Sequence, residues 1–441
     1  MNSAVTPSNL FVRQLQAAEL LIAQNRLQEA ASTLNTLARQ APNDPRLFLL
    51  ASLMANAANN PKGMITAAQK AVELAPEWEV ASIRLAEVYS QLDQSNLAVE
   101  TAERAISESI KNSTLNAELL SKSATIALKD RQFNRAIQWC LKATELEPAN
   151  LNLKHRLAQA LAHNSEFEKA VEIYSDLLQV SSDNQVILFD RLLANLNLGN
   201  IDLAHADAST LHKIDPENDT YQYYDELFRG RTPRTQPAQV ITNLFNSLAD
   251  NFDEHLVTNL KYSLPKDIAE KIAGWYPERN LDLLDLGCGT GLLGANLGRI
   301  DGAFVGVDLS TVMIEKAQRL NVYAQFNQIN ILDALKATRE NYYDVITALD
   351  VLNYVGDLEP VIPNAHRILT NGGRFVFSFE SAPKNVETFG ISIASQRFFH
   401  HKDYVSILLK SAGFSNFEIE ESSLRLEDKQ PVMGFVVIAQ K

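Results

Sequence analysis

The sequence predicts a chain of two parts: an all-α solenoid of repeated helix pairs, followed by a doubly wound α/β domain that closes on an antiparallel hairpin. Two observations carry this prediction. In the first half of the 441 residues, small residues and prolines recur at a fixed spacing. In the second half, short apolar runs alternate with helix-length stretches. The length also favours more than one unit, because a domain averages about 150 residues.

The composition is that of an acidic globular protein. Hydrophobic residues make up 46% of the chain and charged residues 21%, with a formal net charge of -13. This balance argues against wholesale disorder, and against a nucleic acid partner because phosphate neutralisation needs clustered Lys and Arg. The sequence shows neither the pattern of a secretory signal nor an apolar run of about eighteen residues, so we expect no membrane partner.

The two cysteines, Cys140 and Cys288, stand far apart in segments of different character. Their placement predicts two free thiols in a reducing cytoplasm rather than a disulfide. The cysteines form no Cys-x-x-Cys pair and the eight histidines are scattered, so we expect no metal site.

The first half repeats with a period of about 34 residues, which is the period of the tetratricopeptide repeat. One register recurs at intervals of 34, 34, 38, 34 and 34 residues: Ala30, Met64, Ala98, Ala136, Ala170 and Ala204. A second register holds Pro42, Pro76, Ile110, Pro148, Ser182 and Pro216. A third holds Ala18, Ser52, Ala86, Ala124 and Ala158, with the larger Leu192 breaking the pattern in the last copy.

Each copy predicts two amphipathic helices, for example over residues 79–92 and 95–108. The prolines stop the second helix, and the small residues let helices approach closely. One pair cannot bury its apolar face alone, so six copies over about residues 9–216 should stack into one superhelix. The four extra residues of the longest interval fall at 111–116 and predict a longer loop. Such an array offers a groove for a peptide or protein segment; self-association, as in a homodimer, or scaffolding is the alternative.

The repeat register is lost over residues 217–240, which gather Arg, Thr, Pro and Gln. A short helix over 221–228 is expected to cap the last repeat, and the rest predicts a linker. The remaining residues, 241–441, form the second domain. Five strand candidates there alternate with helices and predict a parallel sheet: 281–287, 303–310, 324–333, 343–352 and 374–380. Two later segments, 417–424 and 434–441, predict the closing hairpin.

The first strand candidate ends in the run Asp285-Leu-Gly287-Cys-Gly289-Thr-Gly291. Its glycines leave a turn without side chains, so that the backbone can approach a ligand closely. Their spacing departs from the Gly-x-Gly-x-x-Gly fingerprint of dinucleotide sites. The Asp285 carboxylate would repel a pyrophosphate, but it suits a ligand that carries an ammonium group and no phosphate. S-adenosylmethionine is such a ligand.

Two further carboxylates follow the next two strands. Asp308 is placed to accept hydrogen bonds from a ribose, although it could instead cap a helix over 311–320, a role open to Ser310 as well. Asp333 is placed near an adenine amino group, with Ile331 or Leu332 against the ring. An ordinary helix cap is the alternative for Asp333.

Together these residues resemble the class I S-adenosylmethionine-dependent methyltransferases, over roughly residues 242–441. With the repeats and the stretches 251–262, 348–358 and 372–380, the chain is similar to bacterial predicted methyltransferases that carry a tetratricopeptide repeat. That family has no single established substrate. The resemblance implies S-adenosyl-L-methionine as cofactor and this set of binding residues: Asp285, Gly287, Cys288, Gly289, Gly291, Asp308, Leu309, Asp333 and Asp350.

Acceptor chemistry is expected beyond the ends of the fourth and fifth strands, where the candidates are Asp350, Tyr354, Arg397 and His400. Asp350 could contact the cofactor or the acceptor, or simply form a turn. His400 could act as a general base, with packing as the alternative. Arg397 could bind an acceptor carboxylate or phosphate, with a structural ion pair as the alternative. His255 could lie over the cofactor on an amphipathic helix.

Three functions stay open at this point. The first is a methyltransferase that acts on a protein or peptide recruited by the repeats. The second is a small-molecule methyltransferase whose repeats serve assembly. The third is an interaction scaffold that binds the cofactor without turnover, and the intact glycine run with Asp285 and Asp308 weighs against it.

Overall fold

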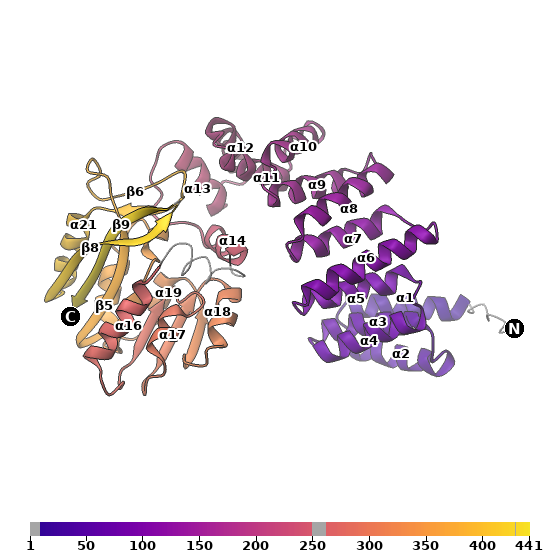
Figure 1. Ribbon diagram of the computed structural model, residues 1–441, viewed down its shortest axis with the longest axis horizontal. Coiled ribbons are helices and arrows are strands. Elements are labelled where there is room, and N and C mark those ends of the chain that lie inside the picture. The colour runs from indigo at the N-terminus through magenta and orange to yellow at the C-terminus, as the bar shows by residue number, and fades with distance from the viewer. Residues whose placement is uncertain (1–8, 249–261, 428) are drawn as a thin grey trace. The chain divides into compact units, whose positions relative to one another are not determined.

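The computed structural model describes residues 9–248, 262–427 and 429–441 (Figure 1). It divides into two compact units, Met1–Asp207 and Ala208–Lys441. Over the described ranges, no helix is long and apolar enough to cross a membrane.

The first unit is built of helices that follow one another in pairs, as the repeats predict (Figure 1). The unit boundary falls within the last helix of the series. The pairs are α1 (Asn9–Ala23) with α2 (Leu27–Gln40), α3 (Pro45–Ala57) with α4 (Pro61–Leu74), α5 (Glu79–Gln91) with α6 (Ser95–Lys111), α7 (Ala117–Lys129) with α8 (Phe133–Leu146), α9 (Leu151–His163) with α10 (Phe167–Val180), and α11 (Gln185–Asn197) with α12 (Ile201–Ile214).

The recurring residues are the buried contact points of these pairs. Every alanine of the two small-residue registers is 0% exposed, and Leu192 keeps the same buried place despite its size. The register prolines each follow the end of a second helix, as Pro42 follows Gln40 and Pro76 follows Leu74. The periodic sequence therefore determines the helix pairs and their contacts, because close packing demands small side chains where helices cross.

The extra residues of the longest interval do not mainly lengthen a loop, and that prediction was wrong. Helix α6 has 17 residues, whereas α4 and α8 have 14 each. Ile110 stands in α6 where other copies carry proline, so the hydrogen-bond ladder continues through it. Most of the insertion is thus accommodated as one further helical turn.

The described part of the second unit carries one mixed sheet that confirms the doubly wound prediction. Strands β3-β2-β1-β4-β5 lie side by side and run parallel. The strands are β1 (Leu283–Leu286), β2 (Phe304–Asp308), β3 (Gln325–Gln328), β4 (Tyr343–Ala348), β5 (Leu369–Ser381), β6 (Phe389–Ile391), β7 (Phe398–His400), β8 (Asn416–Glu427) and β9 (Gln430–Gln440). Strand β9 pairs antiparallel with β5 and β8, which confirms the predicted hairpin.

Helices cover both faces of this sheet, and each face has its own apolar core. On one face, α16 (Leu264–Trp275) and α17 (Leu292–Leu297) pack against the sheet through residues such as Ile268 and Leu293. On the other, α19 (Ile331–Ala337), α20 (Val361–Ile368) and α21 (Lys402–Ala412) contribute residues such as Leu335, Ile362 and Leu409. The strand sequences are continuous hydrophobic runs because their side chains pack into an apolar core on each face of the sheet.

One strand of the second unit was not among the predicted strands. The segment around His400 contains β7, which pairs with β6 and with the end of β5. Helix α13 (Asp219–Phe228) forms as predicted for 221–228, and it lies in the second unit. It is followed by α14 (Ala238–Leu248), and α18 (Thr311–Gln318) and the short helix η3 (Leu352–Tyr354) complete the unit. The domain limits 9–216, 217–240 and 241–441 stay a prediction.

Candidate functional site

A cavity of about 170 Å³ opens where β1, β2 and β4 end in the second unit. The glycine-rich turn after β1 forms one wall, and the turns after β2 and β4 form others. This is the edge of a doubly wound sheet where ligands bind, because the loops after neighbouring parallel strands meet there. The cavity collects most of the residues that the sequence predicts for the site.

The glycines of the turn serve two different purposes. Gly287 has a φ of 65° and lines the cavity. A Cβ added there would lie 2.4 Å from the Val351 side chain, so no other residue fits. Gly289 also lines the cavity, whereas Gly291 does not. Gly291 caps α17 in the left-handed conformation, and a Cβ there would lie 2.7 Å from Leu320. The third glycine is therefore required for packing against α18.

Asp285 lies at the end of β1, buried at 3% exposure, with both carboxylate oxygens bound. The Tyr323 hydroxyl donates to Oδ2 at 2.8 Å, and the Thr347 hydroxyl donates to Oδ1 at 2.7 Å. Burial raises the pKa of Asp285 to about 6, although both hydrogen bonds act in the opposite direction. A buried carboxylate of this kind is a site for a cation, because a positive partner offsets the cost of burying the charge.

Asp308 lies at the end of β2 and holds the glycine turn in place. Its Oδ2 accepts a hydrogen bond from the Gly289 amide at 2.9 Å, and its Oδ1 accepts one from the Ser310 amide at 2.8 Å. Ser310, whose side chain accepts from the Met313 amide, is the cap of α18. Each carboxylate oxygen of Asp308 keeps a lone pair for a ligand hydroxyl. Leu309 and Cys288 line the cavity beside it, and the Cys288 thiol is free.

The turn after β3 contributes Asn330 and Ile331 to the cavity, but not Asp333. Asn330 caps α19 by accepting from the Leu332 amide, so the alternative that Asp333 is the cap was wrong. Asp333 is exposed in the first turn of that helix. The predicted contact of Asp333 with an adenine amino group gains no support from this position, whereas Ile331 lines the cavity and its contact with the ring stays a prediction.

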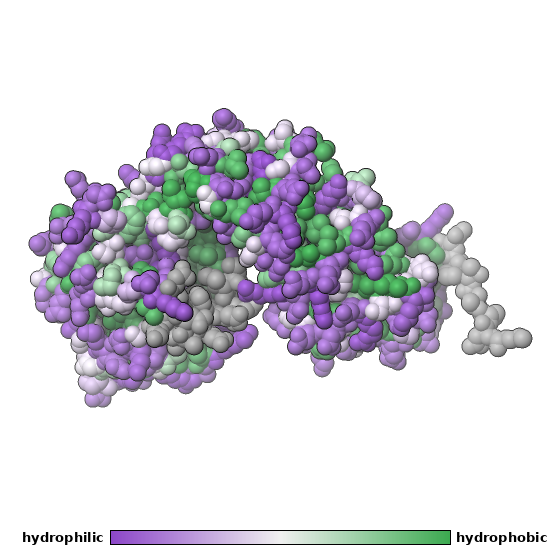
Figure 2. Space-filling model, turned by 45° about the horizontal axis from the view of Figure 1, so that its top comes forward, coloured by the Kyte–Doolittle hydropathy of each residue, from purple (hydrophilic) through white to green (hydrophobic). Residues whose placement is uncertain are grey.

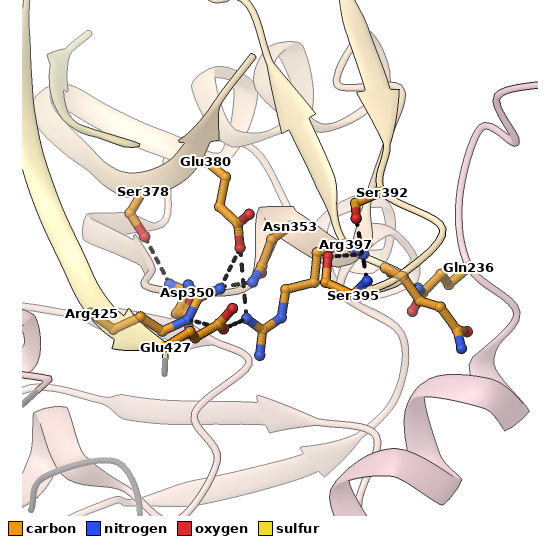
Figure 3. Close-up of polar contacts among 11 residues, drawn as sticks. Gln236, Asp350, Asn353, Ser378, Glu380, Ser392, Ser395, Arg397, Arg425 and Glu427 are labelled. Atoms are coloured by element: carbon orange, nitrogen blue, oxygen red, sulfur yellow. Dashed lines mark hydrogen bonds and ion pairs between the residues drawn. The ribbon is translucent and has the colours of Figure 1, made fainter. Parts of the chain in front are cut away.

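Beyond β4 and β5 the cavity ends at a partly buried cluster of charges (Figure 3). Arg425, on β8, has a side chain that is 0% exposed. Its Nη1 donates to Asp350 Oδ1 at 2.7 Å and its Nε to Glu427 Oε1 at 2.9 Å. Its Nη2 pairs with Glu380. Arg397 Nη1 pairs with Glu427 and lies 3.9 Å from Glu380 Oε1.

This charge cluster (Asp350, Glu380, Arg397, Arg425 and Glu427) has three carboxylates and two guanidinium groups, so its formal charge is negative. Burial alone would raise the pKa of Glu427, but the two arginines outweigh it and lower the pKa. Arg397 is engaged with two carboxylates. The structure therefore shows Arg397 in an ion pair, which was the alternative to binding an anionic acceptor. A role in binding such an acceptor is not favoured.

Asp350 and Tyr354 both line the cavity, on the side where it meets the charge cluster. Asp350 has a φ of 58°, and its amide donates to the Ser378 hydroxyl at 2.8 Å. Positive φ in a residue other than glycine costs energy and concentrates at functional sites. The Tyr354 ring contacts Phe245 edge-on, with ring centres 5.2 Å apart. Both residues thus line the cavity, and their contact with an acceptor stays a prediction.

His400 lies outside the cavity lining and is 0% exposed. Its Nε2 is 3.0 Å from the Val355 carbonyl oxygen and 2.9 Å from that of Gly356. Burial lowers the pKa of His400 to about 4. The prediction of a general base is corrected accordingly: His400 holds the backbone after η3 and does not face a substrate. The other histidine candidate, His255, lies outside the described residues.

An extended segment over residues 231–237, the strap, forms part of the cavity wall, where a linker was expected. Thr235 makes an antiparallel bridge with Val355 and lines the cavity. The Asp357 amide donates to the Arg234 carbonyl at 2.8 Å. The buried Gln236 donates through Nε2 to the Tyr223 hydroxyl at 3.1 Å and to the Gln396 carbonyl. The strap therefore ties α13 to the loop that carries Arg397.

Replacing Gln236 with leucine is expected to loosen the β6–β7 segment. The substitution removes two buried hydrogen bonds of about 0.5–1.5 kcal/mol each, so amide hydrogen exchange over residues 389–400 should become several-fold faster. Exchange in the glycine turn should not change. The matched control is Gln239→Leu, since Gln239 is exposed and bonds only Asn243 among described contacts. Equal exchange in both variants would contradict this role of the strap.

Several residues of the site were not predicted from the sequence. Among them, Arg425, Gln236 and Tyr262 line or support the cavity. Tyr262 stands at the end of the stretch 251–262 that carries part of the family resemblance, which was the available signal. A single buried arginine in a strand and a glutamine in a Pro-rich segment give no such signal.

A family model matches part of the second unit. Residues 284–375 match the family model described as "Methyltransferase domain". A ubiquinone biosynthesis O-methyltransferase of Nitrosomonas europaea is 31% identical over 113 residues, which are 25% of this chain and 47% of that one. The chain thus spans about half the length of this curated relative.

Two solved structures are among those similar to stretches of this chain. The magnesium protoporphyrin IX methyltransferase of Synechocystis PCC 6803, solved with bound SAM, covers 46% of this chain and 96% of its own, with 18% identity and a TM-score of 0.36. The tetratricopeptide repeat protein YrrB, described as having an unusual peptide-binding site, covers 44% of this chain and 97% of its own. Its identity is 14% and its TM-score 0.37.

Proposed function

We propose that the chain transfers the methyl group of S-adenosyl-L-methionine to an acceptor, because its C-terminal part is a class I methyltransferase domain. One arrangement carries the proposal: a side-chain-free turn between two carboxylates, the buried Asp285 and the partly exposed Asp308, at the ends of adjacent strands. Dinucleotide sites place phosphates on such a turn. In this chain the two negative charges beside the turn would repel phosphates.

The described residues fit this cofactor group by group. Asp285 offers a buried negative charge to the ammonium of the amino-acid end. Asp308 offers acceptors to the ribose hydroxyls, since its bonds to Gly289 and Ser310 leave lone pairs free. Ile331 offers an apolar surface to the adenine ring. Each match pairs a ligand group with a side chain of complementary polarity.

The bound cofactor supplies an electrophilic methyl group on a sulfonium. The residues of the chain then act mainly by alignment and by exclusion of water, which suffice for such a displacement. Asp350 and Tyr354 face the acceptor from the wall after β4, and Phe245 and Ile241 close it on the side of α14. The charge cluster, through the buried Arg425, holds Asp350 in its strained backbone conformation.

The acceptor that we propose is a protein or peptide recruited by the repeats. The first helices of successive pairs are joined by polar contacts, as where His155 of α9 lies 2.8 Å from Asp190 of α11. The same helices present exposed apolar side chains at their N-terminal ends, among them Val80 and Val186. Figure 2 shows such hydrophobic surface among the repeats. Exposed apolar side chains that gather on one face are a feature of interaction surfaces.

Labelled-methyl transfer into a cell extract tests this function with the full-length chain. The wild-type protein is compared with Val186→Glu, which alters a first-helix surface residue that is 59% exposed. The matched control is Leu203→Glu on a second helix, at 55% exposure. Neither change removes a buried contact, so both variants should bind the cofactor as the wild type does.

The result expected is label in protein, reduced several-fold by Val186→Glu and unchanged by Leu203→Glu. Label confined to small molecules in all three proteins would favour the alternative of a small-molecule methyltransferase. Binding of S-adenosylmethionine without transfer would favour a scaffold. Absence of cofactor binding to the wild type would refute the proposed function as a whole.

A further inference from the structure

Tyr262 carries a buried hydroxyl group that has no hydrogen-bond partner in the described structure. The residue precedes α16, is 7% exposed and lines the cavity. A buried polar group without a partner is costly, and native structures leave few of them. A group of this kind beside a ligand cavity is explained if the ligand supplies the missing partner.

The surroundings of the hydroxyl show which part of a ligand would meet it. The charges of Asp350, Arg425 and Asp285 all act on Tyr262. These residues mark the side of the cavity between the β1 and β4 strand ends, whereas Asp308 and Ile331 mark the opposite side, after β2 and β3. Tyr262 therefore lies by the position proposed for the amino-acid end of the cofactor and away from that of the adenosine.

We propose that the Tyr262 hydroxyl donates a hydrogen bond to the carboxylate of the amino-acid end of S-adenosylmethionine. This inference rests on the proposed function and assigns one more binding residue to it. Asp285 serves the ammonium of that end, but its negative charge repels the adjoining carboxylate. A neutral O–H donor offsets this repulsion and brings no cation that would compete for Asp285.

The state of the hydroxyl agrees with the role of donor. Burial raises the pKa of Tyr262 well above its usual value, and the charges of Asp350 and Asp285 raise it further. The group thus keeps its proton throughout the physiological range. The guanidinium of Arg425, which is saturated by three carboxylates, lowers the local negative potential on the same side.

The test compares two ligands that differ at this end. S-adenosylhomocysteine carries the amino-acid end, and 5′-methylthioadenosine lacks it. For Tyr262→Phe, we expect the Kd of S-adenosylhomocysteine to rise about tenfold, the effect of losing a hydrogen bond to a charged group. The Kd of 5′-methylthioadenosine should change less than twofold. Both are measured by titration calorimetry on the full-length protein.

Two controls keep the result interpretable. Tyr343→Phe alters a buried tyrosine that does not line the cavity, and it should leave both Kd values unchanged. Without ligand, Tyr262→Phe should unfold at the same temperature as the wild type or higher, because it removes an unpaired buried group.

The outcomes separate this inference from the function on which it rests. Unchanged binding of S-adenosylhomocysteine to Tyr262→Phe would overturn the inference alone, provided that the wild type binds it. Equal weakening of both ligands would also overturn it, because the hydroxyl would then act away from the amino-acid end. Failure of the wild type to bind S-adenosylhomocysteine would overturn the proposed function itself.

Discussion

Replacing Arg425 with methionine is expected to lower the free energy of unfolding of the second unit by about 3–5 kcal/mol. The side chain is fully buried, and its removal leaves Asp350, Glu380 and Glu427 with only Arg397 to balance them. Removing one member of such an ion cluster lowers the free energy of unfolding by more than the intact cluster adds to it. The reason is that the remaining charges are left unpaired where water solvates them poorly.

Denaturant unfolding followed by Trp275 fluorescence measures this loss. Trp275 lies in α16 of the second unit, so Trp78 and Trp139 of the first unit are replaced by phenylalanine in every protein compared. This isolates one unit of a chain whose overall unfolding need not be two-state. The control is Arg319→Met, which alters an exposed arginine. A loss below about 1 kcal/mol would contradict the role of the charge cluster.

The loss should also depend on pH. The arginines lower the pKa of Glu427 below its ordinary value of 4.5. A carboxyl group with a lowered pKa contributes stability above its unfolded pKa, and that contribution disappears as the pH falls through the folded value. The difference between wild type and Arg425→Met should therefore shrink as the pH falls below about 4.5.

Replacing Asp285 with asparagine is expected to raise the Kd of S-adenosylmethionine by about 10- to 100-fold at pH 7.5. Asparagine keeps the size of the side chain and can still bond Tyr323 and Thr347, but it removes the negative charge. Calorimetry over pH 5–8 gives a second signature. Because the pKa of Asp285 is raised to about 6, wild-type affinity should fall as the pH drops through 6.

The same substitution should stabilise the protein without ligand. A carboxyl group whose pKa is raised by burial destabilises the fold at pH values above the folded pKa, so stability is lost as the pH rises toward about 6. Asp285→Asn should therefore unfold less readily at pH 7, by an amount of order 1–3 kcal/mol. Asp301→Asn, at an exposed position, is the control. A variant that binds the cofactor as well as the wild type would remove Asp285 from the site.

Opposite effects on binding and stability would identify Asp285 as a functional group. A carboxylate with a structural role stabilises the free protein, so its loss lowers ligand affinity and stability together. A buried charge that the fold tolerates at a cost is retained for what it binds. The unpaired hydroxyl of Tyr262 belongs to the same category.

The predictions from sequence succeeded where a short segment specifies its own structure. The glycine run places Asp285 at a strand end because strand, turn and helix follow one another within a few residues. The repeat registers determined the helix pairs for the same reason. Asp308, Asp350 and Tyr354 could be placed at the cavity because the carboxyl ends of parallel strands meet at one edge of a sheet.

The same local patterns did not reveal Arg425. It enters the site from β8, the first strand of the closing hairpin, through the pairing of β9 with β5. The β8–β9 register shifts between Ser423 and Arg425. Such an irregularity breaks the alternation of sides, and Leu424 and Arg425 are both buried although they are neighbours. An alternating pattern would place one of them on the solvent side.

The sequence by itself determined the two-part architecture, the glycine turn and the carboxylates that follow the strands, because each depends on contacts between residues close in the chain. Only the tertiary structure decided that Arg397 is neutralised, that His400 is inaccessible and that Tyr262 and the strap complete the cavity. Those outcomes depend on which charges and carbonyl groups a side chain meets from distant segments. Burial then determines the charge state and the binding properties of these side chains. Where water is excluded, the presence or absence of a neighbouring charge makes the largest contribution to their energy.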